Sequence, residues 1–277
     1  MQTLGSLCTG IGGLDLPAEE LYSAELIWVS DIDQHCNEVM RHHRPAAAQL
    51  GDFTKVDPAD VEVPDILTMG FPCQSVSYSG KQLGTEDDRW IFDSAVEFLK
   101  GLPRLPERLI LENVRNLIIH KGGETGLGVL RQVASMGYDI RWGCVRASDA
   151  GMPHKRERFF AICTQGRAEA LTYSNKQRLE RSQHKERRLM SARSDHGLQI
   201  YGRYAAAVAR WESICGITPP APTDELGRLN PQLVEWILGF PVGYVTDIIP
   251  ARTNSLRILG NAVAPAQALL AFKLLEQ

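Results

Sequence analysis

One cysteine, Cys73, stands where an apolar segment gives way to a polar loop. Residues 65–69 form a short apolar run between Pro64 and Gly70, which is the pattern of a buried strand in an α/β sheet. Pro72 fixes the backbone just before the cysteine, and the polar residues after it would make a poor core but a good binding loop. Free cysteines are usually structural, so it is this context that indicates a positioned nucleophile.

Two further kinds of side chain could complete an acid–base site. Glu112 directly follows the apolar segment 108–111, where burial would raise its pKa and favour the protonated form. For the residue considered alone, an ion pair is the simpler expectation. Alternation in a predicted strand over 151–162 places Arg156 and Arg158 on one face, where two arginines suit an anionic or a carbonyl target.

A glycine-bearing turn and an acidic turn come before these groups. The segment C-T-G-I-G-G at 8–13 follows a predicted first strand, and its glycines let the backbone approach a ligand at a strand-to-helix turn. The spacing is not that of the dinucleotide pattern. A second predicted strand, 26–29, ends near Asp31, which is placed to accept hydrogen bonds from ribose hydroxyls. For Asp33, capping of the next helix is an equally good explanation.

Composition indicates an ordinary water-soluble chain with one large core or one core and a small appendage. The 277 residues are 44% hydrophobic and carry a net charge of −3. We find neither a leader segment nor a run of 18 apolar residues, which favours a cytoplasmic protein, in a bacterial cell or a phage-infected host. The six cysteines include no C-x-x-C pair, so we expect reduced thiols and no metal site.

Charge is unevenly distributed along the chain. Residues 166–210 contain ten Lys or Arg against four Asp or Glu, a surplus of six positive charges, so the remainder carries nine negative charges. Such a segment can bind nucleic acid. A solvated surface loop is the alternative explanation.

Several blocks together resemble the DNA cytosine-5 methyltransferase family, in a compact type found in bacteria and phages. G-F-P-C-Q-S-V-S at 70–77 resembles the nucleophile loop of that family. Other family blocks follow in the expected order, namely L-E-N-V at 111–114, the arginine block, R-L-N-P-Q-L-V-E-W-I-L-G-F-P-V-G-Y at 228–244 and L-G-N-A-V-A-P-A-Q at 259–267. The chain departs from the pattern at Cys8, where an aromatic residue is usual, and at His154, where Gln is usual.

The resemblance implies a Rossmann-like, S-adenosylmethionine-dependent methyltransferase fold of the α/β class. Its sheet would be mixed and mostly parallel, with helices on both faces, and a small target recognition region would be added. The implied parts are a catalytic and cofactor-binding domain at 1–163, a target recognition region at 164–227, and a C-terminal segment at 228–277 that returns to the first domain.

The resemblance also implies residue roles. Cys73 would add to carbon 6 of cytosine, Glu112 would protonate ring nitrogen 3, and Arg156 and Arg158 would hold the base carbonyl and the carboxylate. S-adenosyl-L-methionine would be held by Cys8, Thr9, Gly10, Ile11, Gly12, Gly13, Asp31, Ile32, Asp52, Phe53, Pro72, Asn261, Ala262 and Val263. DNA would be contacted by Gln74, Ser77, Arg178, Arg181, Arg187 and Arg188.

The implied activity is methyl transfer to carbon 5 of a cytosine flipped out of double-stranded DNA. We expect a monomer with no membrane association. The sequence leaves open whether it pairs functionally with a restriction endonuclease or protects phage DNA. Two other functions stay open, a transfer RNA cytosine-5 methyltransferase of the same architecture and an inactive DNA-binding relative. Methylation of exocyclic amines is disfavoured, because the Asn/Asp-Pro-Pro-aromatic loop is missing from the sequence.

Overall fold

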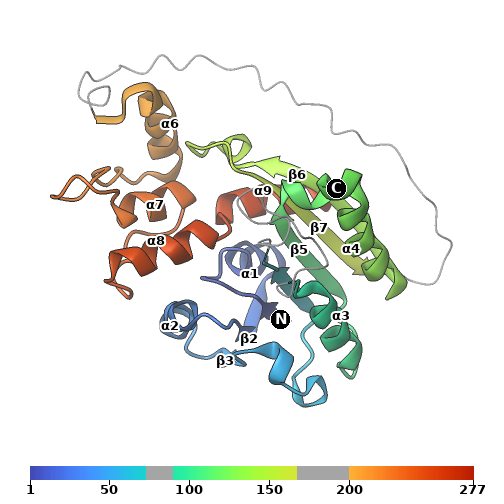
Figure 1. The fold of residues 1–277 in the computed structure, drawn as a ribbon. Coiled ribbons are helices and arrows are strands. Elements are labelled where there is room, and N and C mark those ends of the chain that lie inside the picture. The colour runs from blue at the N-terminus through green and yellow to red at the C-terminus, as the bar shows by residue number, and fades with distance from the viewer. Residues whose placement is uncertain (73–89, 167–199) are drawn as a thin grey trace.

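A seven-stranded sheet forms the centre of the protein in the computed structural model, which describes residues 1–72, 90–166 and 200–277 (Figure 1). The strand order is β3-β2-β1-β4-β5-β7-β6. The strands are β1 Gln2–Leu7, β2 Ala24–Ser30, β3 Ala48–Gln49, β4 Ile66–Gly70, β5 Arg108–Val114, β6 Tyr138–Arg146 and β7 Glu157–Gln165. Strands β1 to β5 pair in parallel, whereas β7 is antiparallel to both β5 and β6. The predicted mixed, mostly parallel sheet is confirmed.

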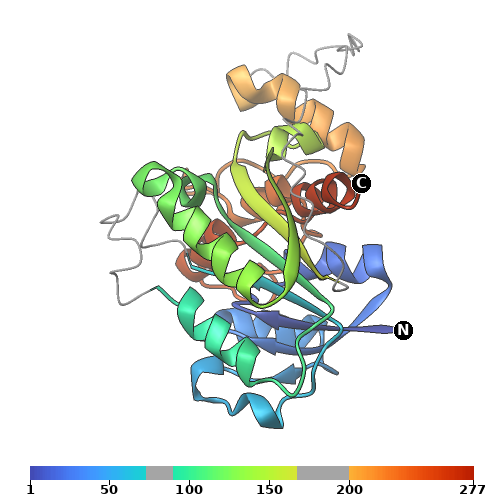
Figure 2. The same cartoon turned by 90° about the vertical axis from the view of Figure 1, so that its right-hand side faces the viewer.

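Helices cover both faces of this sheet. Seen from the side, α3 and α4 lie on one face and α1 and α9 on the other (Figure 2). The helices in the described parts of the chain are α1 Asp15–Tyr22, α2 Gln34–His43, α3 Phe92–Gly101, α4 Glu124–Ser135, α6 Ala205–Cys215, α7 Pro231–Leu238, α8 Arg252–Asn261 and α9 Pro265–Leu275. This arrangement suits parallel strands, which need crossover connections: α1, α2 and α3 connect β1 to β2, β2 to β3 and β4 to β5.

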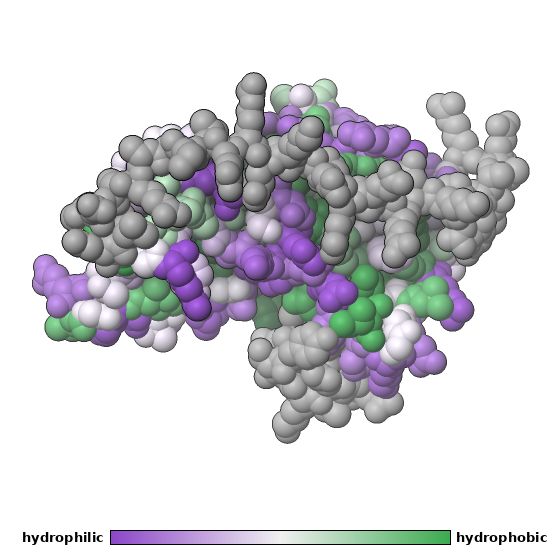
Figure 3. Space-filling view, turned by 90° about the horizontal axis from the view of Figure 1, so that it is seen from above, coloured by the Kyte–Doolittle hydropathy of each residue, from purple (hydrophilic) through white to green (hydrophobic). Residues whose placement is uncertain are grey.

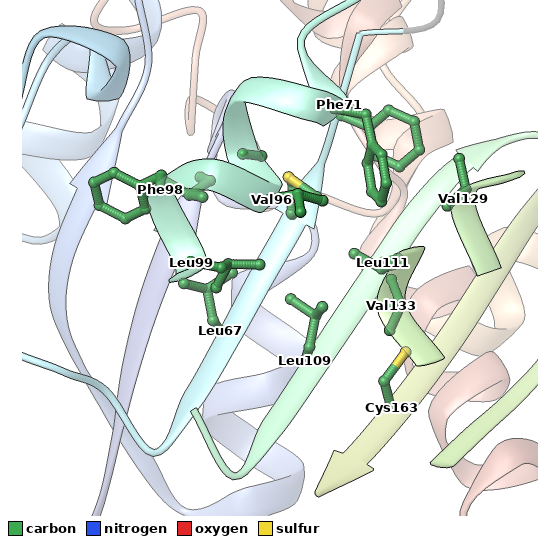
Figure 4. Close-up of a cluster of buried hydrophobic side chains, with 14 of the residues drawn as sticks. Leu67, Phe71, Val96, Phe98, Leu99, Leu109, Leu111, Val129, Val133 and Cys163 are labelled. Atoms are coloured by element: carbon green, nitrogen blue, oxygen red, sulfur yellow. The ribbon is translucent and has the colours of Figure 1, made fainter. Parts of the chain in front are cut away.

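The core is divided by the sheet. On one face, side chains from α3 and α4 pack on Leu67, Leu109 and Leu111 of the central strands (Figure 4). On the other, α1 and α9 pack on the opposite sides of the same strands, around Ile66 and Ile110. Both clusters are buried. This explains why the central strands are continuous apolar runs in the sequence, since both of their faces are covered.

A third cluster joins the C-terminal helices to α2. Trp211 of α6 is buried and its indole N–H donates to the backbone oxygen of Trp236 in α7. The carboxylate of Glu235, also buried, accepts the backbone N–H groups of Gly243, Val245 and Thr246 at 2.5–3.1 Å. This carboxylate therefore fixes the loop after α7.

Two predictions from the sequence concern the C-terminal half. Pro231 is expected to begin a helix that Gly239 ends, and α7 does begin at Pro231 and end before Gly239, whose φ of 81° is left-handed. Tyr204 and Trp211 are expected to dock their segment onto the rest of the protein. Trp211 is buried against α7, but Tyr204 lies exposed in a 3-10 turn before α6, so the prediction is wrong for the tyrosine.

Within the described residues, the stretch 252–275 is apolar and long enough to cross a membrane by length and composition. It consists of α8 and α9, and half of its most apolar window is buried inside the fold. Burial against the sheet and α2 accounts for its composition.

Candidate active site

A cavity opens at the carboxyl ends of the parallel strands, where residues 6–14 and residues 261–263 come together. Its walls come from the turn after β1, the end of β4, the end of β5 and the connection between α8 and α9. The lining residues are Ser6, Cys8, Thr9, Gly10, Ile11, Leu14, Gly70, Glu112, Asn261, Ala262 and Val263. Eight of these eleven were predicted site residues, and this edge of an open α/β sheet is where ligands bind.

Hydrogen bonds with the side chains of Thr9 and Asp31 fix the conformation of the glycine-bearing turn that lines this cavity. Cys8 and Gly10 have φ of 51° and 57°, and the second is a conformation that glycine adopts without strain. The backbone N–H of Gly10 donates to the Asp31 carboxylate at 2.7 Å, and the Thr9 hydroxyl donates to backbone oxygens of Ser6 and Ser30. The turn is thus fixed to the end of β2.

The two aspartates after β2 have different surroundings. Asp33 caps α2, accepting the N–H groups of His35 and Cys36, and forms an ion pair with Arg257 of α8. These contacts, the ion pair foremost, lower its pKa. Asp31 faces the glycine turn, and burial raises its pKa against the opposing backbone hydrogen bonds. The capping explanation therefore holds for Asp33, while Asp31 holds Gly10 of the turn that lines the cavity.

Ile32 lies between these aspartates with its side chain 79% exposed. An isoleucine this exposed offers an apolar surface on which a flat ring could pack. Phe53 is different, since its ring is buried in the core and packs edge-on against Phe98. Asp52 caps the short turn that contains Phe53 and pairs with Lys55 at 3.0 Å. The cavity lining does not include seven of the predicted cofactor residues, namely Gly12, Gly13, Asp31, Ile32, Asp52, Phe53 and Pro72.

Gly13 allows the turn after β1 to contact the segment between α8 and α9. A Cβ atom placed on it would lie 2.0 Å from the backbone oxygen of Val263 and 3.1 Å from the ring of Phe240. Backbone cannot move aside as a flexible side chain can, so only glycine fits here. The contact holds the 261–263 wall of the cavity against the start of α1.

Gly13→Ala is therefore expected to lower the free energy of unfolding by about 1–3 kcal/mol, the cost of overpacking, and to weaken S-adenosylmethionine binding. Chemical denaturation and isothermal titration calorimetry measure the two effects. The matched control is Gly128→Ala in α4, where a Cβ would meet nothing within 4 Å and helix stability should rise slightly. Equal stability of the Gly13 variant and the wild type would contradict this packing argument.

Glu112 supplies the carboxylate among the cavity-lining residues, and Arg158 is its partner. The carboxylate is only 6% exposed, and its Oε1 lies 3.2 Å from the Arg158 Nε. Burial raises the Glu112 pKa, and this effect outweighs the opposing charges of Arg158 and Arg156. Both earlier expectations are met at once, because the acid is ion-paired and is still shifted towards its protonated form.

The arginine block is only partly a strand. Strand β7 begins at Glu157, so Arg156 precedes it and the predicted alternation starts later than expected. The backbone oxygen of Arg156 is nevertheless fixed by the side-chain amide of Gln267 in α9 at 2.9 Å. His154 is half-buried; burial and the nearby arginines lower its pKa to about 4, against a hydrogen bond with the Ile237 backbone. It is therefore neutral at physiological pH and contacts α7.

Asp15 was not identified from the sequence. It is buried under the glycine turn and accepts a hydrogen bond from the Thr68 hydroxyl of β4. Burial raises its pKa to about 7, in spite of hydrogen bonds with Thr68 and Ser6 that lower it. The available signal was one acidic residue inside the apolar stretch G-G-L-D-L-P.

The raised pKa of Asp15 predicts a pH-dependent stability. Below about pH 4 both folded and unfolded states hold the proton; between about pH 4 and 7 only the folded state does, so stability falls as pH rises and then levels off. About three pKa units correspond to roughly 4 kcal/mol. Asp15→Asn should remove this loss, so its stability advantage over the wild type in urea should grow by up to that amount from pH 4 to pH 8. An advantage independent of pH would show that this carboxyl is ionised in the folded state.

The remaining predicted residues divide into two groups. Pro72 is exposed at the last described position before the first gap. Cys73, Gln74, Ser77, Arg178, Arg181, Arg187 and Arg188 lie outside the described residues. Among the described residues, no cluster of His, Cys, Asp and Glu could hold a metal ion.

Comparison with known proteins identifies relatives along much of the chain. The chain is 36% identical over 157 residues to the type II methyltransferase M.NgoBI of Neisseria gonorrhoeae, covering 56% of this chain and 48% of that protein. It is 35% identical over 159 residues to M.HhaI of Haemophilus parahaemolyticus, covering 57% and 47%. The chain thus spans about half the length of these curated relatives.

Solved structures match over the full length. Dnmt2 methyltransferase of S. pombe superposes with a TM-score of 0.66 at 18% identity, covering 100% of this chain and 99% of that one. A putative DNA modification methyltransferase encoded within an E. coli prophage gives 0.61 at 17% identity, covering 100% and 99%. At these identities the likeness shows the methyltransferase fold. The family model for C-5 cytosine-specific DNA methylases matches residues 2–207, and the chain therefore belongs to that family.

Proposed function

We propose that this protein transfers a methyl group from S-adenosylmethionine to carbon 5 of cytosine in duplex DNA. One observation carries the proposal most directly. Glu112, which is paired with Arg158, lines the same cavity as the glycine turn and as Gly70, the last residue of β4, three residues before Cys73 in the sequence. Glu112, Arg158 and the methyl group of the bound cofactor would then all be close to the same base.

Three features in and around the cavity suit S-adenosylmethionine. The glycine turn offers backbone before α1, Asp31 carries a carboxylate just after β2, and the next residue, Ile32, exposes an apolar side chain. Asn261, Ala262 and Val263 also line the cavity. When bound, the cofactor supplies the electrophilic methyl group.

Cytosine is a poor nucleophile at carbon 5, so its ring must first be activated. In the proposed mechanism the Cys73 thiolate adds to carbon 6 while protonated Glu112 donates to ring nitrogen 3, which absorbs the charge. Carbon 5 then takes the methyl group, loses its proton to a base, and the thiolate leaves. Arg158 would hold the base carbonyl and Glu112 through this sequence.

The target base must leave the duplex for this chemistry. Carbon 6 and ring nitrogen 3 of a stacked, paired cytosine are covered, so the base would be flipped into the cavity. Double-stranded DNA is therefore the proposed partner. We infer a functional pairing with a restriction endonuclease from the type II names of the relatives. We also propose a cytoplasmic location, because the DNA of a bacterial cell lies in its cytoplasm.

The direct test is incubation of purified protein with methyl-labelled S-adenosylmethionine and duplex DNA, followed by sequencing of the modified bases. We expect 5-methylcytosine at one short sequence. Transfer RNA should be offered in parallel. Methylation of RNA alone would replace the DNA proposal with the RNA alternative, and no transfer to either would support the inactive relative.

A further inference from the structure

One carboxylate is shared by two arginines beside the candidate active site. Glu157, the first residue of β7, lies opposite Arg146 at the end of β6, and its Oε1 is 3.7 Å from the Arg146 Nε. Its Oε2 is 3.5 Å from the Nε of Arg115, which directly follows β5. Two positive charges thus face one negative charge at the ends of three adjacent strands.

These ion pairs are loose and accessible. Both distances exceed the 2.7–2.9 Å typical of charge-assisted hydrogen bonds. The side chains of Arg115 and Arg146 are 53% and 49% exposed. The pair Arg104–Asp65, equally exposed at 50% and 27%, closes to 3.1 Å, so exposure alone does not explain the looseness.

Glu157 and its two arginines lie next to the residues of the candidate active site. Glu157 is the neighbour of Arg158, which holds Glu112, but alternation along β7 directs it to the other face of the sheet. The β6 arrowhead in Figure 1 points towards α6, and from above hydrophilic side chains gather in the middle of this side of the molecule (Figure 3). Lys155 adds an exposed positive charge, and Asp149 is occupied in accepting the Arg146 backbone N–H.

From this arrangement we propose that Arg115 and Arg146 bind DNA phosphates and that Glu157 is a counter-ion which they exchange for them. The inference rests on the proposed function, since it assumes that the bound nucleic acid enters at this edge. An arginine fork can bind a phosphate through two short hydrogen bonds, whereas each arginine here meets Glu157 only at 3.5 or 3.7 Å. Glu157 would thus weaken DNA binding in the wild type, the opposite of a structural role.

The experiment measures duplex DNA binding by fluorescence anisotropy between about 50 and 200 mM salt, with the full chain and a fluorescein-labelled duplex. Arg115→Gln combined with Arg146→Gln should reduce the slope of log affinity against log salt by about 1.8, or 0.9 for each phosphate contact. Glu157→Gln should keep the wild-type slope and bind roughly threefold tighter or more, because a repelling charge is removed. Arg104→Gln, at the opposite edge, should match the wild type.

The outcomes separate this inference from the proposed function. A slope unchanged in the double variant, or weaker binding by Glu157→Gln with an unchanged melting temperature, would overturn the counter-ion role. Tighter binding of an RNA stem than of the duplex would overturn the choice of DNA. If no cytosine is methylated while the salt slopes change as expected, the proposed function fails and the phosphate contacts stand.

Discussion

Cys73→Ala is expected to abolish methyl transfer while leaving the fold and S-adenosylmethionine binding intact. The reason is that the thiolate would form the covalent bond without which carbon 5 does not become nucleophilic. The measurement is methyl incorporation into duplex DNA, with calorimetry of cofactor binding beside it.

The matched control is Cys215→Ala, which changes a partly exposed cysteine at the end of α6 and should retain full turnover. A mechanism-based trap adds a second readout. Fluorine on carbon 5 cannot leave as a cation, so duplex DNA with 5-fluorocytosine at the target should give a denaturation-resistant adduct, only with S-adenosylmethionine and only with Cys73 present. Substantial turnover by the alanine variant, or no adduct from protein that methylates DNA, would mean that another residue is the nucleophile.

The residues just before Cys73 are described, and they are fixed beside Glu112. Phe71 is buried against Trp90 and Phe92, and its backbone oxygen accepts the side-chain N–H of Asn113 at 3.0 Å. Asn113 follows Glu112 in β5. The acid and the entry to the cysteine segment are therefore fixed to one another by consecutive residues of one strand.

The order of elements was predictable because local patterns sufficed for it. Apolar runs of four or five residues between glycine, proline and polar turns predicted β1, β2, β4 and β5 to within three residues of their bounds. The strand predicted over 151–162 is present as β7, which begins only at Glu157 and pairs antiparallel with β6. Pro231 and Gly239 marked the two ends of α7 by backbone chemistry alone.

Contacts between distant segments were not predictable in the same way. The fit of Gly13 under the Val263 backbone joins residues 250 positions apart, and no local pattern distinguishes it from the neighbouring glycines. Phe53 was assigned to the cofactor by resemblance, yet its ring fills the core against Phe98. The buried carboxyl of Asp15, at the start of α1, accepts a hydrogen bond from Thr68, which lies in β4, 53 positions along the chain.

The second large effect is expected at Glu112. Glu112→Gln keeps the size of the side chain but removes the proton that ring nitrogen 3 would receive, so turnover should fall by about 100-fold or more, the scale of a missing general acid. Affinity for S-adenosylmethionine should change little. Because burial raises the Glu112 pKa, the wild type should keep the required acid to higher pH than a solvated glutamate would, and its rate should fall as pH rises through that pKa.

A control for buried carboxylates in general is Glu235→Gln. Glu235 is as buried as Glu112, but it accepts backbone N–H groups in the loop after α7, so its replacement should lower stability while turnover per folded molecule is retained. The Glu112 variant should show the reverse, with a nearly unchanged melting temperature and no high-pH fall in its residual rate. If Glu112→Gln turns over at the wild-type rate, the carboxyl serves only as the ion-pair partner of Arg158, and another group must protonate the base.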